Sequence, residues 1–361
     1  MQGKLTAVAM SGGVDSSVAA AILARAGRPV VGFSMYLARR HEGRPGEKVR
    51  CCSLDDCQDA RAVAAHLGFE HHVLDMEGDF RRLVLEPFAS DYARGRTPSP
   101  CVLCNSFVKF GTLLDRARAV GAEKVATGHY AILEADPRTG RTLLRKAVDD
   151  GKDQSYFLFD LSETQRRAAE FPLGRMTKAE VRDTARALAL PVAEKPESMD
   201  LCFVNAGENY REFLATRGLA RDAAPGEIVD IEGRTLARHA GIAGFTVGQR
   251  RGLGLAAGRP LYVVRIEEES RRVVVGDDED LLRDSCTIEY VRWIPFERPG
   301  GPVRATVRIR STHPGAAATI LDSADGTAVV RFDEPQRAIA PGQAAVVYDG
   351  DLVLGGGWIA G

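Results

Sequence analysis

Hydrophobic positions in the first 205 residues switch between short apolar runs and longer stretches with helical spacing. The apolar runs predict strands at 5–10, 29–37, 72–74 and 124–131. Apolar residues three and four positions apart predict helices at 16–26, 54–67, 80–93 and 102–120. Strands that alternate with helices favour an α/β fold with a doubly wound parallel sheet. Ligands of such sheets bind beyond the carboxyl ends of the strands, so the segments ending near Ser11, Met35 and Gly128 should face one crevice.

The pattern changes near residue 206. Glycines become frequent between 226 and 258, and short β-like runs follow at 261–266 and 272–275. Apolar and polar residues then alternate from Val303 to Arg310, and turn signals such as Asp325-Gly326 and Asp349-Gly350 separate further short runs. This spacing is typical of a small antiparallel barrel. We therefore expect three domains: an α/β domain at 1–205, a small mostly-β domain at 206–285 and a β-barrel at 286–361.

Composition narrows the class of protein. The chain has 361 residues, of which 45% are hydrophobic and 27% charged, so it can bury real cores and is neither disordered nor fibrous. The net charge of −1 argues neither for nor against nucleic acid, and any RNA site must be a local patch. No apolar run approaches the length of a membrane span, and the first strand begins too close to Met1 for a leader peptide. Seven cysteines, most of them before residue 203, favour a cytoplasmic protein that uses thiols for chemistry or metal binding.

The most informative motif is Ser11-Gly12-Gly13-Val14-Asp15-Ser16-Ser17, between the first predicted strand and helix. Its two glycines let the backbone approach an anion closely, and the start of a helix favours negative charge. Asp15 can hold Mg²⁺ against phosphates. The lysine of a Walker A loop and the Rossmann glycine fingerprint are both missing from this stretch. The motif therefore indicates a different kind of phosphate-binding loop.

A second motif places Cys101 and Cys104 directly after two prolines, at the start of a predicted helix. The helix dipole there favours the thiolate, which is the reactive and metal-binding form, and Lys109 is close in sequence. Cys202 lies at the end of the α/β region. The spacing alone does not separate redox, zinc, iron–sulfur and buried-thiol interpretations. For the remaining thiols, packing is favoured over metal binding: Cys51, Cys52, Cys57 and Cys286.

These motifs resemble, in order and nearly end to end, those of the tRNA-specific 2-thiouridylases, a family of the ATP pyrophosphatase (PP-loop) superfamily. The segments that carry the resemblance are 11–17, 97–105, 126–130, 152–158, 197–203, 245–254 and 355–359. The resemblance implies an adenine nucleotide alpha-hydrolase-like catalytic domain. It also implies ATP- and Mg²⁺-dependent adenylation of the 2-carbonyl oxygen of the wobble uridine, which sulfur then replaces. The partners would be a tRNA with a wobble uridine and a sulfur donor: a cysteine desulfurase, a relay protein or free sulfide.

The resemblance also assigns residues. The nucleotide would be bound by Ala9, Met10, Ser11, Gly12, Gly13, Val14, Asp15, Ser16, Met35 and Gly128. The tRNA would be contacted by Ser99, Pro100, Cys101, His129, Lys152, Asp153, Gln154, Arg310, Ser311 and Gln343. Taken alone, His129 is also consistent with a satisfied histidine at a strand end, Gln154 with a surface amide, and the arginines near 310 with a solvated barrel face.

Two sulfur mechanisms follow from the resemblance. In the first, Cys202 carries the persulfide sulfur and Cys104 attacks it, leaving a Cys104–Cys202 disulfide. In the second, Cys101, Cys104 and Cys202 hold a [4Fe–4S] cluster whose open iron binds exogenous sulfide. The second arises because many relatives have an aspartate, the proposed general acid/base, where this chain has Cys101.

Two other functions fit parts of the chain. Another PP-loop ligase that adenylates a small carboxylate or amide would explain Ser11–Ser17, but it needs neither the C-terminal β domains nor the Cys104/Cys202 pair. A non-catalytic RNA-binding or metal-scaffold protein would leave the Asp15 loop unexplained.

Overall fold

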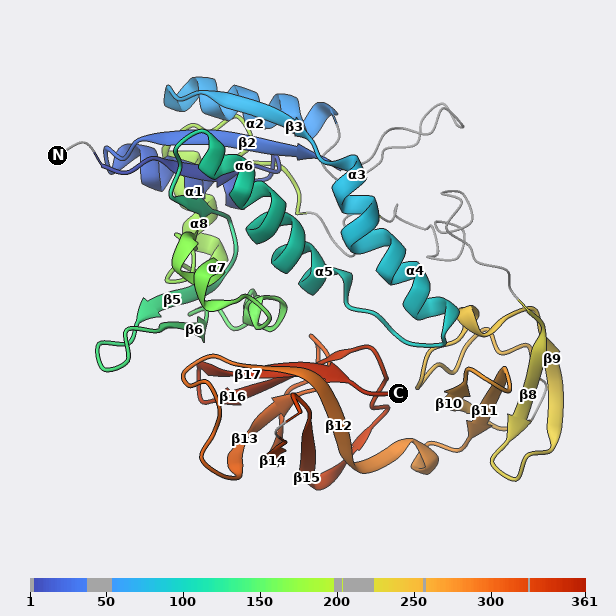
Figure 1. Ribbon diagram of the computed structural model, residues 1–361. Helices are drawn as coiled ribbons and strands as arrows, with labels where there is room; N and C mark the ends of the chain where they lie inside the picture. The colour runs from blue at the N-terminus through green and yellow to red at the C-terminus, as the bar shows by residue number, and fades with distance from the viewer. Residues whose placement is uncertain (1–2, 38–53, 198–202, 204–223, 256–257, 324) are drawn as a thin grey trace. The chain divides into compact units, whose positions relative to one another are not determined.

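The computed structural model describes residues 3–37, 54–197, 203, 224–255, 258–323 and 325–361. The chain forms two compact units (Figure 1). The first comprises Met1–Val84, Cys101–Asn209 and Asp351–Val353, and the second comprises Leu85–Pro100, Tyr210–Gly350 and Leu354–Gly361.

The first unit is built on a five-stranded parallel sheet, as the sequence predicts. Its strand order is β3-β2-β1-β4-β7. The strands are β1 (Thr6–Ala9), β2 (Val30–Tyr36), β3 (His71–Asp75), β4 (Lys124–Ala126) and β7 (Ala169–Glu170). The chain order reverses between β1 and β4, and such a switch point is where open α/β sheets bind ligands. The predicted doubly wound fold class is confirmed, and the carboxyl ends of β2, β1 and β4 lie next to one another.

Helix α1 (Val14–Arg25) is the most deeply buried helix near the site. Its run Val18–Ala21 has no exposed surface, because alanine side chains allow neighbouring helices to approach closely. It packs with α2 (Leu54–Leu67) and α8 (Lys178–Ala187) in one apolar cluster. This packing fixes the residue just before α1, which is the phosphate-loop glycine Gly13.

The two long predicted helices each contain a π-helical segment, which the sequence does not predict. The first runs through α3 (Glu77–Phe80), a π segment (Arg81–Leu85) and α4 (Glu86–Ala93). The second runs through α5 (Pro100–Leu103), a π segment (Cys104–Thr112) and α6 (Leu113–Ala119). Widened turns of this kind often occur at functional sites.

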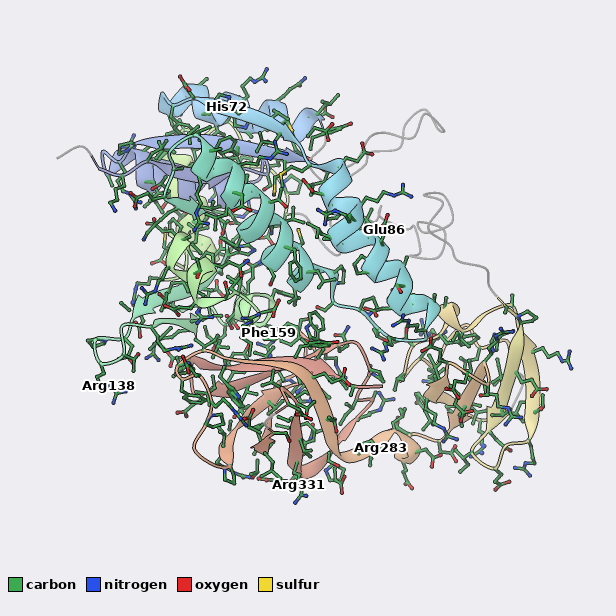
Figure 2. All side chains as sticks on the ribbon, viewed as in Figure 1. His72, Glu86, Arg138, Phe159, Arg283 and Arg331 are labelled. Carbon is green, nitrogen blue, oxygen red and sulfur yellow. The ribbon has the colours of Figure 1, made fainter. Side chains whose placement is uncertain are left out.

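The strand predicted at 124–131 is wrong in its second half. Strand β4 ends at Ala126, and β5 (Ala131–Ala135) begins a hairpin with β6 (Thr142–Lys146). The chain leaves the sheet at Gly128, where a Cβ would lie 2.6 Å from the Ser16 nitrogen. Any larger residue would clash with the start of α1, so this position requires a glycine. Figure 2 labels Arg138, which is exposed in the hairpin turn, and Phe159, which is fully buried after a short 3₁₀ turn (Ser155–Leu158).

Helix α7 (Glu163–Ala168) also belongs to the first unit, and it begins with a capping box between Ser162 and Gln165. Its residues contact β4 and the π segment at 104–112.

The second unit holds two β structures. A four-stranded sheet of order β10-β11-β8-β9 consists of β8 (Gly226–Asp230), β9 (Thr235–His239), β10 (Tyr262–Glu267) and β11 (Arg272–Gly276). A six-stranded barrel consists of β12 (Leu282–Trp293), β13 (Val303–Arg308), β14 (Ala316–Asp322), β15 (Ala328–Arg337), β16 (Ala344–Asp349) and β17 (Leu352–Ile359). The barrel closes because β12 pairs with both β15 and β17. The predicted β-rich region and its terminal barrel are thus confirmed, with turns at Asp325-Gly326 and Asp349-Gly350.

Candidate active site

The loop at 11–17 follows β1 and folds against the first turn of α1. Gly12 has φ +70, and a Cβ on it would lie 2.3 Å from the Asp56 carbonyl oxygen. Gly13 is the N-cap of α1, and its carbonyl accepts from the Ser17 hydroxyl at 2.8 Å. The Ser16 hydroxyl accepts from the Ser11 nitrogen at 3.2 Å. The loop is therefore compact and lies at a helix N-terminus, which is the geometry that binds phosphate.

Asp15 is the centre of a charged cluster at this loop. Its two carboxylate oxygens accept from Lys178 Nζ at 2.6 and 2.8 Å. The Tyr130 hydroxyl donates to the same carboxylate at 2.8 Å. Burial, together with the Asp15 carboxylate, raises the pKa of Tyr130, so the phenol stays protonated as the donor.

Local structure holds these partners in place. Lys178 is the first residue of α8, whose N-cap Thr177 forms a capping box with Glu180. The Lys178 backbone nitrogen also donates to Asp149 Oδ2 at 2.9 Å. Tyr130 is held by Gln154, whose side-chain oxygen accepts from the Tyr130 nitrogen at 3.0 Å.

A second lysine ties the Gly12 turn to α2. Lys195 Nζ donates to the Gly12 carbonyl at 3.0 Å, to Asp56 at 2.7 Å and to Asp59 at 2.6 Å. Burial lowers the pKa of Lys195, but the two carboxylates outweigh it and the net shift is upward. Two residues further on, Glu197 accepts from Lys152 at 2.7 Å and lies 3.3 Å from Lys178. The hydrogen bond from Lys152 lowers the pKa of Glu197 despite partial burial.

The Cys-x-x-Cys motif lies in a helix that begins at Pro100, with Cys101 in its first turn as predicted and Cys104 one turn later. Cys101 is half-buried in α5, and Cys104, 7% exposed, opens the π segment. The side chain of Gln165 donates to two carbonyls of this segment, Ser106 at 2.6 Å and Phe110 at 3.0 Å. These bonds tie the π segment to α7.

The other thiols are less informative. Cys57 is buried in α2, in agreement with packing, and burial raises the pKa of Cys286 to about 12. Cys51, Cys52 and Cys202 lie outside the described residues.

His129 is buried next to the loop. Its Nδ1 lies 2.7 Å from the Thr127 hydroxyl, and its Nε2 lies 3.4 Å from Lys109 Nζ. Burial, with Lys109 nearby, holds the pKa of His129 well below its usual value, so the ring is neutral at pH 7. This environment matches the satisfied strand-end histidine, and the RNA contact expected of His129 stays a prediction.

Several of the other predicted RNA residues bond to groups within the protein. Asp153 accepts from the Ala147 and Ser155 nitrogens at 3.2 and 3.1 Å. In the second unit, Gln343 Nε2 donates to the Thr97 and Pro98 carbonyls at 3.0 and 3.2 Å. Ser99 and Pro100 are buried, and Arg310 and Ser311 follow β13.

The predicted nucleotide residues come together around the ends of β1, β2 and β4. Ala9 ends β1 and Met10 follows it, Met35 is buried in β2, and Gly128 packs against Asp15 and Ser16. Four charged or polar residues of the cluster were not assigned from sequence: Tyr130, Lys178, Lys195 and Glu197. Three of them had a signal in the sequence, namely the motifs at 126–130 and 197–203 and the capping box at Thr177, whereas Lys195 had none.

Comparisons with known proteins agree with this geometry. The tRNA methyl transferase HUP domain matches residues 4–206, a tRNA methyl transferase PRC-barrel domain matches 211–277, and an aminomethyltransferase β-barrel domain matches 283–359. The tRNA-specific 2-thiouridylase MnmA of Solibacter usitatus is 51% identical, with 98% of each chain covered. The MnmA of Koribacter versatilis is 47% identical, again with 98% of each chain covered.

A solved NMN synthetase from Francisella tularensis is 16% identical, covering 59% of this chain and 72% of its own. Its TM-score of 0.35 is too low to carry an argument. No described helix is long and apolar enough to cross a bilayer. Identity near one half along almost the whole chain, with the phosphate loop formed at the expected strand end, leads to one conclusion: the chain belongs to the tRNA-specific 2-thiouridylase family.

Proposed function

We propose that this chain is a tRNA-uridine 2-sulfurtransferase that converts the wobble uridine to 2-thiouridine. In the first step the uridine 2-oxygen attacks the α-phosphate of ATP, and pyrophosphate leaves. In the second step sulfur attacks C2, and AMP leaves with the former carbonyl oxygen. The observation that carries the proposal is the near full-length match to 2-thiouridylases, together with a phosphate loop formed at a sheet switch point.

The nucleotide would lie on the loop Ser11–Ser16, with Met35 and Gly128 at the adenosine. The backbone N–H groups at the start of α1 favour the phosphate charge. Mg²⁺ takes oxygen ligands from one or two carboxylates and from substrate phosphates, and the Asp15 side chain is 35% exposed, so its carboxylate suits that role. When bound, Mg²⁺ would neutralise charge on the departing pyrophosphate.

The sulfur step would use Cys104 and Cys202. The Cys104 thiolate attacks the inner sulfur of a Cys202 persulfide, a disulfide forms, and the terminal sulfur leaves as the nucleophile for C2. A reductant must then regenerate both thiols. Cys104 begins the π-helical segment, and such segments often occur at functional sites, which supports this role.

Cys101 leaves the [4Fe–4S] alternative open. Within the described part of the chain, no three His, Cys, Asp or Glu side chains form a metal site, and the third cluster ligand would be Cys202, outside that part. Anaerobic purification tests it: full activity in an iron-free, colourless preparation would exclude the cluster, and loss of activity on iron removal would support it.

The proposal includes a tRNA surface, a sulfur source and the domain division. The tRNA would contact Ser99, Pro100, Cys101, His129, Lys152, Asp153, Gln154, Arg310, Ser311 and Gln343. The sulfur source would be a cysteine desulfurase, a relay protein or free sulfide, and the protein would work in the cytoplasm. The three family matches support domains at 1–205, 206–285 and 286–361.

Mass spectrometry of tRNA after incubation with ATP, Mg²⁺ and a sulfide source tests the function. We expect one sulfur in place of one oxygen in the wobble base. Cys104→Ala and Cys202→Ala should each abolish thiolation and keep tRNA binding. Pyrophosphate release triggered by small acids and not by tRNA would contradict the proposal and favour the small-molecule ligase.

A further inference from the structure

The loop of this protein has no lysine of its own, yet a lysine ammonium lies at its edge. Lys178 comes from α8 and reaches both oxygens of Asp15 at 2.6 and 2.8 Å. The Lys178 side chain is 13% exposed and the Asp15 side chain 35% exposed. The pair is therefore partly buried, and its carboxylate is the more exposed partner.

We infer that Lys178 is the cation that binds the pyrophosphate part of the nucleotide, and that its ion pair with Asp15 is the resting form of the site. This inference rests on the proposed function, because it takes ATP as the substrate. When the nucleotide binds, the Lys178 ammonium turns to the phosphate oxygens, which leaves the Asp15 carboxylate as the group that would hold Mg²⁺. The ammonium thus supplies the charge that the loop sequence lacks.

The charge balance at the loop requires such a cation. Asp15 puts a negative charge in the first turn of α1, where the helix dipole offers only about half a positive charge to a phosphate. An uncompensated carboxylate there would repel a polyanion. Lys178 cancels that charge in the resting form and is already within reach of the loop.

The other nearby lysines are committed elsewhere. Lys195 uses its ammonium on three acceptors, Gly12, Asp56 and Asp59, so it cannot turn to a ligand without releasing the loop. Lys152 donates to Glu197 at 2.7 Å. Lys178 also contacts two carboxylates, but the nearer one is Asp15 of the loop itself, so its ammonium already lies at the phosphate site.

The backbone of Lys178 is held in a way that suits a fixed ligand contact. Its nitrogen donates to Asp149, and the Thr177 capping box fixes the start of α8. Its ammonium also lies 5.9 Å from the centre of the Tyr130 ring. The ammonium can therefore move from carboxylate to phosphate by side-chain rotation while the helix stays in place.

The test is binding of pyrophosphate in EDTA to the full chain, measured by calorimetry, with thermal unfolding as the folding check. Asp15→Asn should raise the affinity several-fold, because it removes a negative charge and releases the ammonium. In the Asp15→Asn background, Lys178→Met should lower the affinity about tenfold or more, and Lys178→Arg should retain most of it. Lys4→Met in the same background is the charge-matched control, since Lys4 pairs with Glu123 on the surface.

The double variant removes both partners of the ion pair, so neither partner remains as an unpaired charge that would destabilise the fold. If Lys178→Met and Lys4→Met had equal effects in the Asp15→Asn background, Lys178 would be only a structural partner of Asp15 and the inference would be overturned. If the wild-type chain bound neither ATP with Mg²⁺ nor pyrophosphate, the proposed function itself would fail.

Discussion

Replacing Gly12 by alanine adds two destabilising effects at the phosphate loop, backbone strain and a steric clash, and a second glycine allows them to be measured separately. Gly12 and Gly27 share φ +70, so a Cβ at either position is strained by the same left-handed backbone. That strain costs about 1–2 kcal/mol. At Gly27 a Cβ would meet nothing within 4 Å, whereas at Gly12 it would lie 2.3 Å from the Asp56 carbonyl oxygen. The Gly12 backbone fixes the position of the Cβ, and the carbonyl belongs to the backbone of α2. Neither atom can rotate away, so α2 or the loop must move.

Forced overpacking of this kind costs about 1–3 kcal/mol more. We therefore expect Gly12→Ala to lose about 2–5 kcal/mol of unfolding free energy and Gly27→Ala about 1–2 kcal/mol. In a unit of this size each 1 kcal/mol lowers Tm by about 2–4 °C, which calorimetry resolves. Gly12→Ala should also weaken ATP binding at least tenfold, whereas Gly27→Ala should leave it unchanged.

Gly13→Ala completes the comparison. The nearest atom to a Cβ there is Ser11 Oγ at 3.6 Å, so Gly13→Ala has only the small cost of alanine at an N-cap and should lower Tm less than Gly12→Ala. Any loss of ATP affinity in this variant must come from the ligand meeting the new methyl group. Equal Tm losses in Gly12→Ala and Gly27→Ala would refute the contact with Asp56 as the reason for the glycine.

Three further predictions concern charge. Lys195→Met leaves Asp56 and Asp59 without their shared cation, so it should lower Tm and ATP affinity, whereas the exposed Lys4→Met should change neither. Burial lowers the pKa of His71 to about 4 in the folded state, whereas the unfolded chain binds this proton near pH 6.5. The unfolding free energy therefore has its full value above pH 6.5 and decreases as pH falls towards 4. Tm measured from pH 7 to 4 should fall less steeply in His71→Gln than in the wild type, and a parallel slope would contradict this. Finally, tRNA affinity should fall by about 0.7–0.9 log units per log unit of salt for each phosphate neutralised, and a salt-independent affinity would exclude an electrostatic surface.

Local pattern alone determined much of the framework. Apolar spacing located α2 at 54–67, and the Asp-Gly turns located the ends of the barrel strands. The glycine–serine loop could be recognised because its residues are neighbours, and the chemistry of a helix start depends only on that local order. The alternation at 303–309 likewise indicated a half-buried strand, which is β13.

Tertiary structure decided which distant residues complete the site. Lys178 lies 163 positions from Asp15, and Lys195 lies 183 positions from Gly12. Such pairs depend on how α8 and the following segment pack on α1, and no local periodicity encodes that. The strand predicted at 124–131 likewise ends at Ala126, and Gly128 then packs against the first turn of α1, a contact that depends on the tertiary structure. Short-range sequence sets elements and turns, whereas the packing of apolar faces between elements sets which charges meet.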